Sequence, residues 1–245
     1  MGEQLAIFDS GIGGLSLFFY LQTLLNKPIT YLADNRFFPY GDKSEEELLP
    51  IVERIIKFLK KDHRYIIIAC NTASVIYEKY LKDQFEDVYP IVNHTIADVF
   101  KQEKKKIGII GTKTTIDSNL YQKAFINLEG YLIKDRACSE LVKASEELDE
   151  VFIKNYIEDE LKDFKSEVEL LVLSCTHFNR LKSYFDTFFE GKVVVLPSGY
   201  GLIERIVKDI EFTNHENRIY LTANDPKYLK KLLKFLKINH IFENK

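Results

Sequence analysis

Residues 66–74 read IIIACNTAS, and residues 170–178 read LLVLSCTHF. Each stretch is a continuous apolar run that ends at a cysteine and continues with short polar residues. Such a run is typical of a strand covered on both faces, as in a parallel sheet. Each cysteine is therefore expected at the carboxyl end of a strand, where a helix begins. Open α/β sheets bind their ligands at these strand ends.

Similar apolar runs predict six strands in all, and stretches of helical period lie between them. The predicted strands are 5–8, 29–33, 65–69, 107–110, 170–173 and 193–196. The predicted helices are 44–61, 114–127, 146–164, 177–189 and 226–236. The helix over 44–61 is the clearest, because Ser44 can cap it and three glutamates fill its first turn. The alternation of strands and helices predicts an α/β fold with mainly parallel sheets.

The order of these parts is repeated along the chain. The first strand leads to Ser10 and the strand near the middle leads to Thr112, so each is followed by a small hydroxyl residue. Sixty residues separate Ser10 from Cys70, and 63 separate Thr112 from Cys175. The matching order and spacing favour an internal repeat over the generic similarity of βα units. Two similar α/β units, each with one cysteine at its strand ends, could then face each other across a cleft.

Length and composition argue against several classes of protein. The 245 residues suffice for one large domain or two small ones. Lys and Arg number 34 against 37 Asp and Glu, and this net charge of −3 argues against a nucleic-acid partner. No signal peptide or membrane-spanning run is recognisable, so we expect a cytoplasmic protein that does not bind membranes. Three cysteines argue against a disulfide framework, and no metal-ligand motif occurs.

Cys70 and Cys175 are the leading candidates for chemistry. Backbone N–H groups and the helix dipole favour an anion at a helix N-terminus, so the thiolate is expected to be stabilised relative to a free thiol. A lone cysteine at the end of a buried strand is more often a small core residue. Two cysteines in matched settings, each close to a threonine, favour function. Cys138 lacks such company and is interpreted as a structural thiol.

Other polar residues near the strand ends have two interpretations each. Asp9 precedes a glycine-rich turn, GIGG, which suits either a phosphate or a carboxylate, and Asp9 could serve as a general base or orient an amine. His177 follows Cys175 by two residues and is suited to proton transfer. Three short polar residues are predicted at helix N-termini, where plain N-capping is the alternative role: Asn71, Thr72 and Thr176.

Two opposed thiols suit one reaction in particular. Inversion of a carbon centre by proton transfer needs a base on one face and an acid on the other. One thiolate removes the Cα proton, the opposite thiol delivers a new one, and the reverse reaction exchanges their roles. Paired half-sites are therefore typical of a racemase or epimerase, whereas a cysteine hydrolase needs one cysteine, a histidine and an oxyanion hole.

Five motifs resemble, in order and spacing, those of the cofactor-independent aspartate/glutamate racemase superfamily. They are FDSGIGGLS, PYG, ACNTAS, GTKTTIDS and CTHF. The resemblance implies two α/β domains related by a pseudo-twofold, with the active site in the cleft between them. It also implies that the end of the chain returns to the first domain, so that residues 1–93 plus 206–245 form one domain and residues 94–205 form the other.

Carried to this sequence, the resemblance implies that Cys70 and Cys175 are the catalytic thiols. Asp9 would assist the first thiol and His177 the second. A further catalytic residue of the family corresponds by counting to Glu146, eight residues after Cys138, although the intervening SELVKAS differs from the family pattern. The substrate-binding positions of the family correspond to Asp9, Ser10, Tyr40, Gly41, Asn71, Thr72, Thr112, Thr115, Thr176 and His177.

The histidine of CTH points to the glutamate branch of the superfamily. The resemblance therefore implies interconversion of L- and D-glutamate without a cofactor or metal, a supply of D-glutamate for peptidoglycan, and a homodimer. An aspartate or other amino-acid racemase and a catalytically silent amino-acid-binding relative are the alternatives. A phosphate-binding enzyme that uses the GIGG turn would leave both cysteines unexplained.

Overall fold

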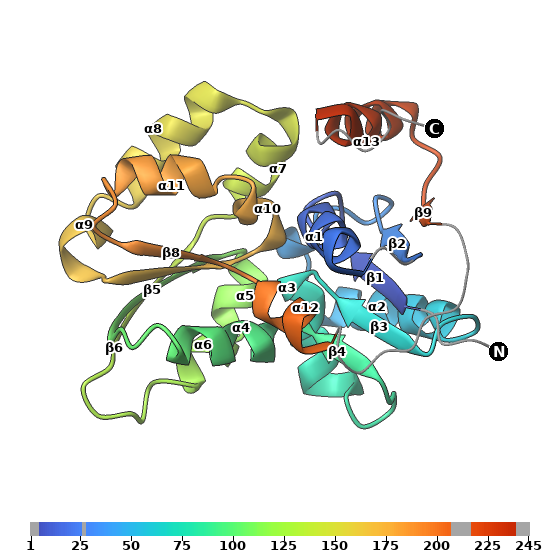
Figure 1. The fold of residues 1–245 in the computed structure, drawn as a ribbon, viewed down its shortest axis with the longest axis horizontal. Helices are drawn as coiled ribbons and strands as arrows, with labels where there is room; N and C mark the ends of the chain where they lie inside the picture. Colours follow the sequence, from blue (N-terminus) through green and yellow to red (C-terminus); the bar gives the residue numbers. More distant parts are fainter. Residues whose placement is uncertain (1–4, 26–27, 207–216, 239–245) are drawn as a thin grey trace.

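Two parallel β-sheets organise the computed structural model, which describes residues 5–25, 28–206 and 217–238 (Figure 1). The first sheet contains, in spatial order, β4 (Val88–Pro90), β3 (Tyr65–Ile68), β1 (Leu5–Asp9), β2 (Thr30–Ala33) and β9 (Arg218–Leu221). The second contains β6 (Leu132–Ala137), β5 (Lys106–Gly111), β7 (Leu170–Ser174) and β8 (Val194–Pro197). Every neighbouring pair of strands is parallel, as the alternation of strands and helices predicts.

The two sheets repeat one topology. When β1 to β4 are matched with β5 to β8, both sheets have the order fourth, third, first, second strand, and β9 is added only to the first. This order confirms the internal repeat that the spacing of the two cysteine motifs predicts. Strand β9 returns the end of the chain to the first sheet, while the division into residues 1–93 plus 206–245 and 94–205 stays a prediction. Hereafter the first unit is the part built on the first sheet, and the second unit the part built on the second.

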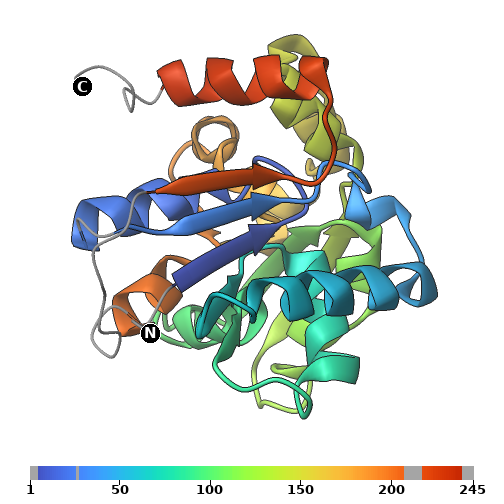
Figure 2. The same ribbon diagram turned by 90° about the vertical axis from the view of Figure 1, so that its right-hand side faces the viewer.

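Helices flank both sheets (Figures 1 and 2). Those that follow strands of the first unit, with the two last helices of the chain, are α1 (Leu15–Leu25), α2 (Glu45–Leu59), α3 (Asn71–Ile76), α4 (Ile91–Phe100), α12 (Tyr200–Ile206) and α13 (Pro226–Ile238). Those of the second unit are α5 (Lys113–Asp117), α6 (Leu120–Lys123), α7 (Glu140–Glu147), α8 (Glu150–Glu160), α9 (Phe164–Glu167), α10 (Thr176–Asn179) and α11 (Lys182–Phe188). No helix in these described ranges is long and apolar enough to cross a membrane.

Three predicted helices are divided in the structure. The helix expected over 114–127 is divided at Asn119, and the one expected over 146–164 begins earlier, at Glu140, and is interrupted at Leu148. Both Asn119 and Leu148 have a positive φ, 57° and 58°, and this left-handed conformation ends a helical hydrogen-bond series. The helix expected over 177–189 consists of α10 and α11. The apolar period of the sequence continues across these breaks. It therefore does not show where one helix ends and the next begins.

The strands that the sequence does not predict all lie at sheet edges. Strands β4 and β9 end the first sheet, and β6 ends the second. Most side chains of β6 and β9 are exposed or half-buried, so their sequences, LIKDRA and RIYL, are not continuous apolar runs. Strands buried on both faces have continuous apolar sequences, whereas exposed edge strands such as β6 and β9 do not.

Helix α2 shows how local sequence and packing agree. The Ser44 hydroxyl accepts a hydrogen bond from the Glu47 N–H (3.2 Å), and the Glu47 carboxylate accepts one from the Ser44 N–H (2.8 Å), which together form a capping box. One face of the helix carries the apolar residues that pack on the first sheet: Leu48, Ile51, Val52, Ile55, Ile56 and Leu59.

Replacing Ser44 with alanine is expected to lower the free energy of unfolding by about 1 kcal/mol, because the Glu47 N–H loses its acceptor at the helix start. Urea unfolding followed by circular dichroism measures the change. The matched control is Ser44→Asp, which keeps an oxygen at the cap and should retain most of the stability. Equal losses in the two variants would contradict the capping role.

Candidate active site

The structure places Cys70 and Cys175 at equivalent ends of the two sheets. Cys70 follows β3 and precedes α3, and Cys175 follows β7 and precedes α10. Each side chain is buried, with 6% of the residue exposed, and neither cysteine is in a disulfide. The charge of Cys175 is among the influences that raise the pKa of Cys70. The two thiols therefore lie within electrostatic reach of each other, as the repeat predicts.

Cys70 is held by groups of the first unit. Its thiol donates to the Ser10 hydroxyl (3.5 Å), and its sulfur accepts from the Ala73 N–H (3.5 Å). Burial and the charge of Asp9 raise the pKa of Cys70 to about 12, despite the helix N-terminus and these two hydrogen bonds. The prediction of a stabilised Cys70 thiolate is therefore wrong. Desolvation and a neighbouring carboxylate outweigh the helix N-terminus, and Cys70 is a thiol at neutral pH.

Asp9 is fully buried between the two units. One carboxylate oxygen accepts from the Gly11 N–H (2.9 Å), and the other accepts from the hydroxyl of Thr176 in the second unit (2.9 Å). Burial raises the pKa of Asp9, although the charge of His177 and both hydrogen bonds oppose the shift. Asp9, the acid beside Cys70, is therefore also held in place by Thr176, the residue that follows Cys175.

His177 connects Cys175 to Glu146. Its Nδ1 lies 4.0 Å from the Cys175 sulfur, and its Nε2 lies 3.0 Å from Glu146 Oε1. Burial alone would lower the pKa of His177, but the hydrogen bonds and charges of Cys175 and Glu146 raise it to about 10. Burial likewise would raise the pKa of Glu146, but the hydrogen bond and charge of His177 keep it below the usual value. The pair is thus an imidazolium and a carboxylate, both buried.

The hydroxyl and amide groups around the thiols bond across the two units. The Thr72 hydroxyl lies 2.9 Å from that of Thr112 and 3.3 Å from that of Thr115. The Asn71 side chain accepts from the Tyr121 hydroxyl (2.6 Å) and donates to the Ser198 hydroxyl (3.2 Å). These bonds join the polar ends of the two units directly.

Plain N-capping does not describe the short polar residues that follow the cysteines. Helix α3 begins at Asn71 and α10 begins at Thr176, so the cysteines themselves occupy the N-cap positions. The capping interpretation is therefore wrong for Asn71, Thr72 and Thr176. The structure shows a side-chain cap at Thr112 instead, whose hydroxyl accepts from the Thr115 N–H at the start of α5.

The glycine-rich turn lies against side chains of the second unit. A Cβ on Gly13 would lie 2.6 Å from His177 Nδ1 and 2.7 Å from Thr176 Oγ1. A Cβ on Gly11 would lie 2.8 Å from Glu146 Oε1. Such distances are far below ordinary contact, so these glycines let the turn approach the second thiol and its partners. The turn that the sequence offers to a phosphate or a carboxylate therefore packs against protein side chains in this structure.

The remaining predicted site residues lie at the edge of this cluster. Tyr40 is buried and its hydroxyl donates to Asp34 (2.5 Å), while a Cβ on Gly41 would lie 2.5 Å from Thr112 Cβ. Cys138 is fully buried in the core of the second unit, which agrees with its interpretation as a structural thiol. Tyr228, at the start of α13, also reaches the cluster, and no sequence motif marks it.

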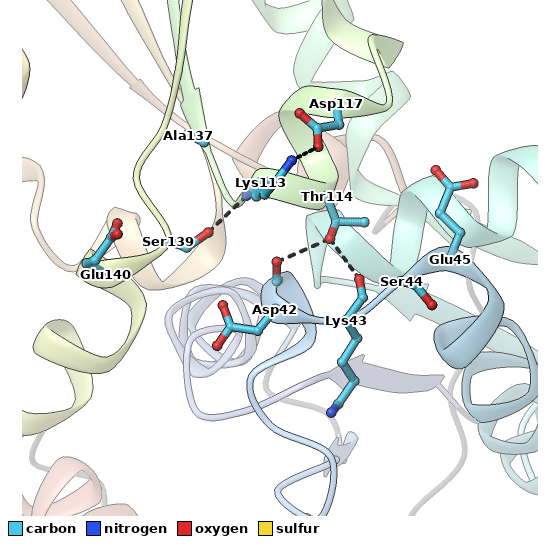
Figure 3. A pocket seen from close by; sticks show the side chains of 11 residues that line it. Asp42, Lys43, Ser44, Glu45, Lys113, Thr114, Asp117, Ala137, Ser139 and Glu140 are labelled. Atoms are coloured by element: carbon cyan, nitrogen blue, oxygen red, sulfur yellow. Dashed lines mark hydrogen bonds and ion pairs between the residues drawn. The ribbon is translucent and has the colours of Figure 1, made fainter.

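A pocket of about 660 Å³ lies between the two units beside the cluster (Figure 3). Residues 41–45 line it from the first unit, and Lys113, Thr114, Asp117, Ala137, Ser139 and Glu140 line it from the second. The Thr114 hydroxyl donates to the carbonyl oxygens of Gly41 (3.2 Å) and Lys43 (3.1 Å) at its rim. Neither Cys70 nor Cys175 lines this pocket.

Known proteins are similar to this chain in sequence and in fold. Residues 28–198 match the Asp/Glu/hydantoin racemase family. The glutamate racemase of Aquifex aeolicus is 34% identical over 198 residues, 78% of each chain, and that of Borreliella burgdorferi is 35% identical over 229 residues, 89% of this chain and 84% of the relative. The crystal structure of glutamate racemase from Campylobacter jejuni superposes with a TM-score of 0.87 at 26% identity, over 98% of this chain and all of that one. The chain therefore belongs to the Asp/Glu/hydantoin racemase family.

Proposed function

We propose that this protein is a glutamate racemase that interconverts L- and D-glutamate by proton transfer between Cα and two thiols, without a cofactor. One observation carries the proposal: Cys70 and Cys175 occupy equivalent strand ends of two repeated units, and each has its own ionisable neighbour. A base and an acid on opposite faces of a carbon centre are what inversion by proton transfer requires. The similarity to glutamate racemases supports glutamate as the substrate.

The two halves of the site have different charges. On one side the Cys70 thiol is protonated, beside Asp9. On the other side the His177 imidazolium lies beside Cys175, with its Nδ1 4.0 Å from the sulfur. In one direction, the Cys175 thiolate removes the Cα proton and the Cys70 thiol donates its proton to the opposite face. The turnover leaves Cys175 as the thiol and Cys70 as the thiolate, and the other enantiomer reacts by the reverse steps.

The polar groups around the thiols suit a substrate with two carboxylates and an amine. The hydroxyls of Thr72, Thr112 and Thr115 bond to one another, and each can instead donate to a carboxylate oxygen. The other proposed contacts are Asp9, Ser10, Tyr40, Gly41, Asn71, Thr176 and His177. Because the thiols act directly and no electron sink is used, fixed donors of this kind must stabilise the carbanion character at Cα.

The proposed reaction is tested by hydrogen exchange at Cα. We expect purified protein in heavy water, without pyridoxal phosphate, to convert either enantiomer of glutamate to the other with deuterium at Cα, as followed by NMR and chiral chromatography. Aspartate in a parallel incubation tests the alternative racemase. Failure of deuterium to enter glutamate would refute the proposal, and tight glutamate binding without exchange would support a silent binding protein.

The proposal includes a cellular setting. D-Glutamate made in this way would supply peptidoglycan synthesis, as the resemblance implies. All three cysteines are unpaired, which suits the reducing cytoplasm. A homodimer remains part of the proposal, with sedimentation velocity as its measurement.

A further inference from the structure

We infer that Tyr228, in the first turn of α13, is a positioning residue that acts through Glu146 on His177 and thereby on the Cys175 half of the reaction. The inference rests on the proposed function for its effect on activity. It gives a role to the C-terminal helix, in which no sequence motif is recognisable.

The Glu146 carboxylate is held unevenly. Its Oε1 lies within hydrogen-bond distance of three donors: His177 Nε2 (3.0 Å), the Tyr228 hydroxyl (3.3 Å) and the Ile12 N–H (3.4 Å). Its Oε2 is buried and accepts no hydrogen bond from any residue that the structure describes, and it lies 3.9 Å from Lys231 Nζ. The orientation of this carboxylate therefore depends on the donors that share Oε1.

Tyr228 reaches Glu146 from a different part of the fold. Helix α13 runs beside the first sheet, and its first turn lies close to α7, which carries Glu146 (Figures 1 and 2). The Tyr228 ring lies 6.3 Å from that of Phe38, which in turn lies 5.5 Å from the His177 ring. A Cβ on Gly11 would lie 3.0 Å from the Tyr228 hydroxyl oxygen. The hydroxyl is thus confined on the side of the turn.

The hydroxyl can be removed without loss of the helix. Tyr228 itself is 6% exposed, and α13 is also anchored by the buried Leu232, Phe235 and Leu236. The Phe235 ring stacks on that of Phe19 in α1, with ring centroids 6.0 Å apart. These apolar contacts remain in Tyr228→Phe, so this variant separates the hydrogen bond from the packing of the helix.

The chemistry of Tyr228 suits a donor that never titrates in the working range. Burial and the charge of Glu146 raise its pKa far above the ordinary value, so the phenol keeps its proton. The other charged or titratable groups that face the His177–Glu146 pair are Cys175, Asp9, Tyr31, Lys231 and Arg180. Among these groups Tyr228 contributes a neutral hydrogen bond, and its loss changes how the carboxylate meets Nε2 of His177 without changing the net charge.

Tyr228→Phe is expected to lower kcat about tenfold in the direction that His177→Asn slows more, and less in the other direction, since a hydrogen bond to a charged group that positions His177 is lost outside the substrate contacts. The same substitution in a Glu146→Gln background should have no further effect, because the carboxylate through which it acts is gone. The matched control is Tyr20→Phe, which removes a phenol–carboxylate bond to Glu204 (3.0 Å) at the surface and should leave kcat unchanged. Urea unfolding checks that both variants fold.

Two results would overturn the inference: a Tyr228→Phe enzyme with the wild-type kcat, or a tenfold loss that persists in the Glu146→Gln background. Failure of the proposed function is recognised separately, because the wild-type protein would then exchange no deuterium. In that case the NMR titration of His177 alone tests whether Tyr228 acts on His177 through Glu146. A midpoint displaced by at least about 0.3 pH unit in Tyr228→Phe would support the coupling, and an unchanged midpoint would refute it.

Discussion

Cys70→Ser and Cys175→Ser are each expected to lower kcat/KM for glutamate by about 10³-fold or more, because each removes one of the two groups that exchange the Cα proton. A serine hydroxyl has nearly the size of the thiol but is a much weaker acid, so it neither forms the attacking anion nor delivers its proton as readily. The loss is measured by circular dichroism of the racemising solution, starting from each enantiomer.

The third cysteine supplies the control for this experiment. Cys138→Ser changes a buried thiol in the core of the second unit that makes none of the hydrogen bonds described for the polar cluster, and it should keep activity near that of the wild type. All three variants need an unfolding curve, because all three sites are buried. A similar loss of activity in all three variants would indicate structural damage and contradict the two-thiol mechanism.

Each single-thiol variant also predicts a partial reaction. The cysteine that remains can still remove the Cα proton from the enantiomer that faces it and return a solvent deuteron to the same face. We therefore expect slow deuterium uptake with retention of configuration, for one enantiomer in Cys70→Ser and for the other in Cys175→Ser. Uptake by the same enantiomer in both variants would show that the thiols do not face opposite sides of Cα.

Asp9→Asn and His177→Asn are each expected to lower kcat/KM for glutamate by about 10²-fold, since each removes the ionisable neighbour of one thiol. Enantiomers have equal free energies in water, so kcat/KM must remain equal in the two directions for every variant. The asymmetry is therefore expected in kcat and KM separately, with the slower direction opposite in the two variants. Equal kcat losses in both directions would contradict the assignment of Asp9 to Cys70 and of His177 to Cys175.

The pH dependence of the reaction follows from the protonated state of His177. His177 has its pKa raised to about 10, so the imidazolium persists through neutral pH and is lost as the pH rises through about 10. An alkaline limb near this value is expected in kcat for the wild type and should be absent from His177→Asn. A limb near the ordinary histidine pKa of about 6.5 would show that Glu146 and Cys175 do not hold the proton on His177.

Features carried by neighbouring residues can be predicted from the sequence. The central strands appear as apolar runs, the start of α2 appears as Ser44 followed by glutamates, and the repeat appears as two similar spacings, of 60 and 63 residues. Helix breaks at Asn119 and Leu148 and the edge strands have no comparable local pattern, because left-handed residues and exposed edges are set by what packs around them. Glu146 is predicted only by counting from Cys138 along the family pattern, and no pattern in the sequence indicates its contact with Tyr228.

The sequence by itself determined that two similar α/β units each end a central strand at a cysteine, because strand burial, turns and helix starts depend on residues close together in the chain. Only the tertiary structure decided the state of the site. Thr176 meets Asp9 across 167 residues, and Tyr228 meets Glu146 across 82. Burial beside Asp9 makes Cys70 a thiol where the helix N-terminus alone favours a thiolate. Desolvation and long-range hydrogen bonds depend on which surfaces come together, and no local pattern records them.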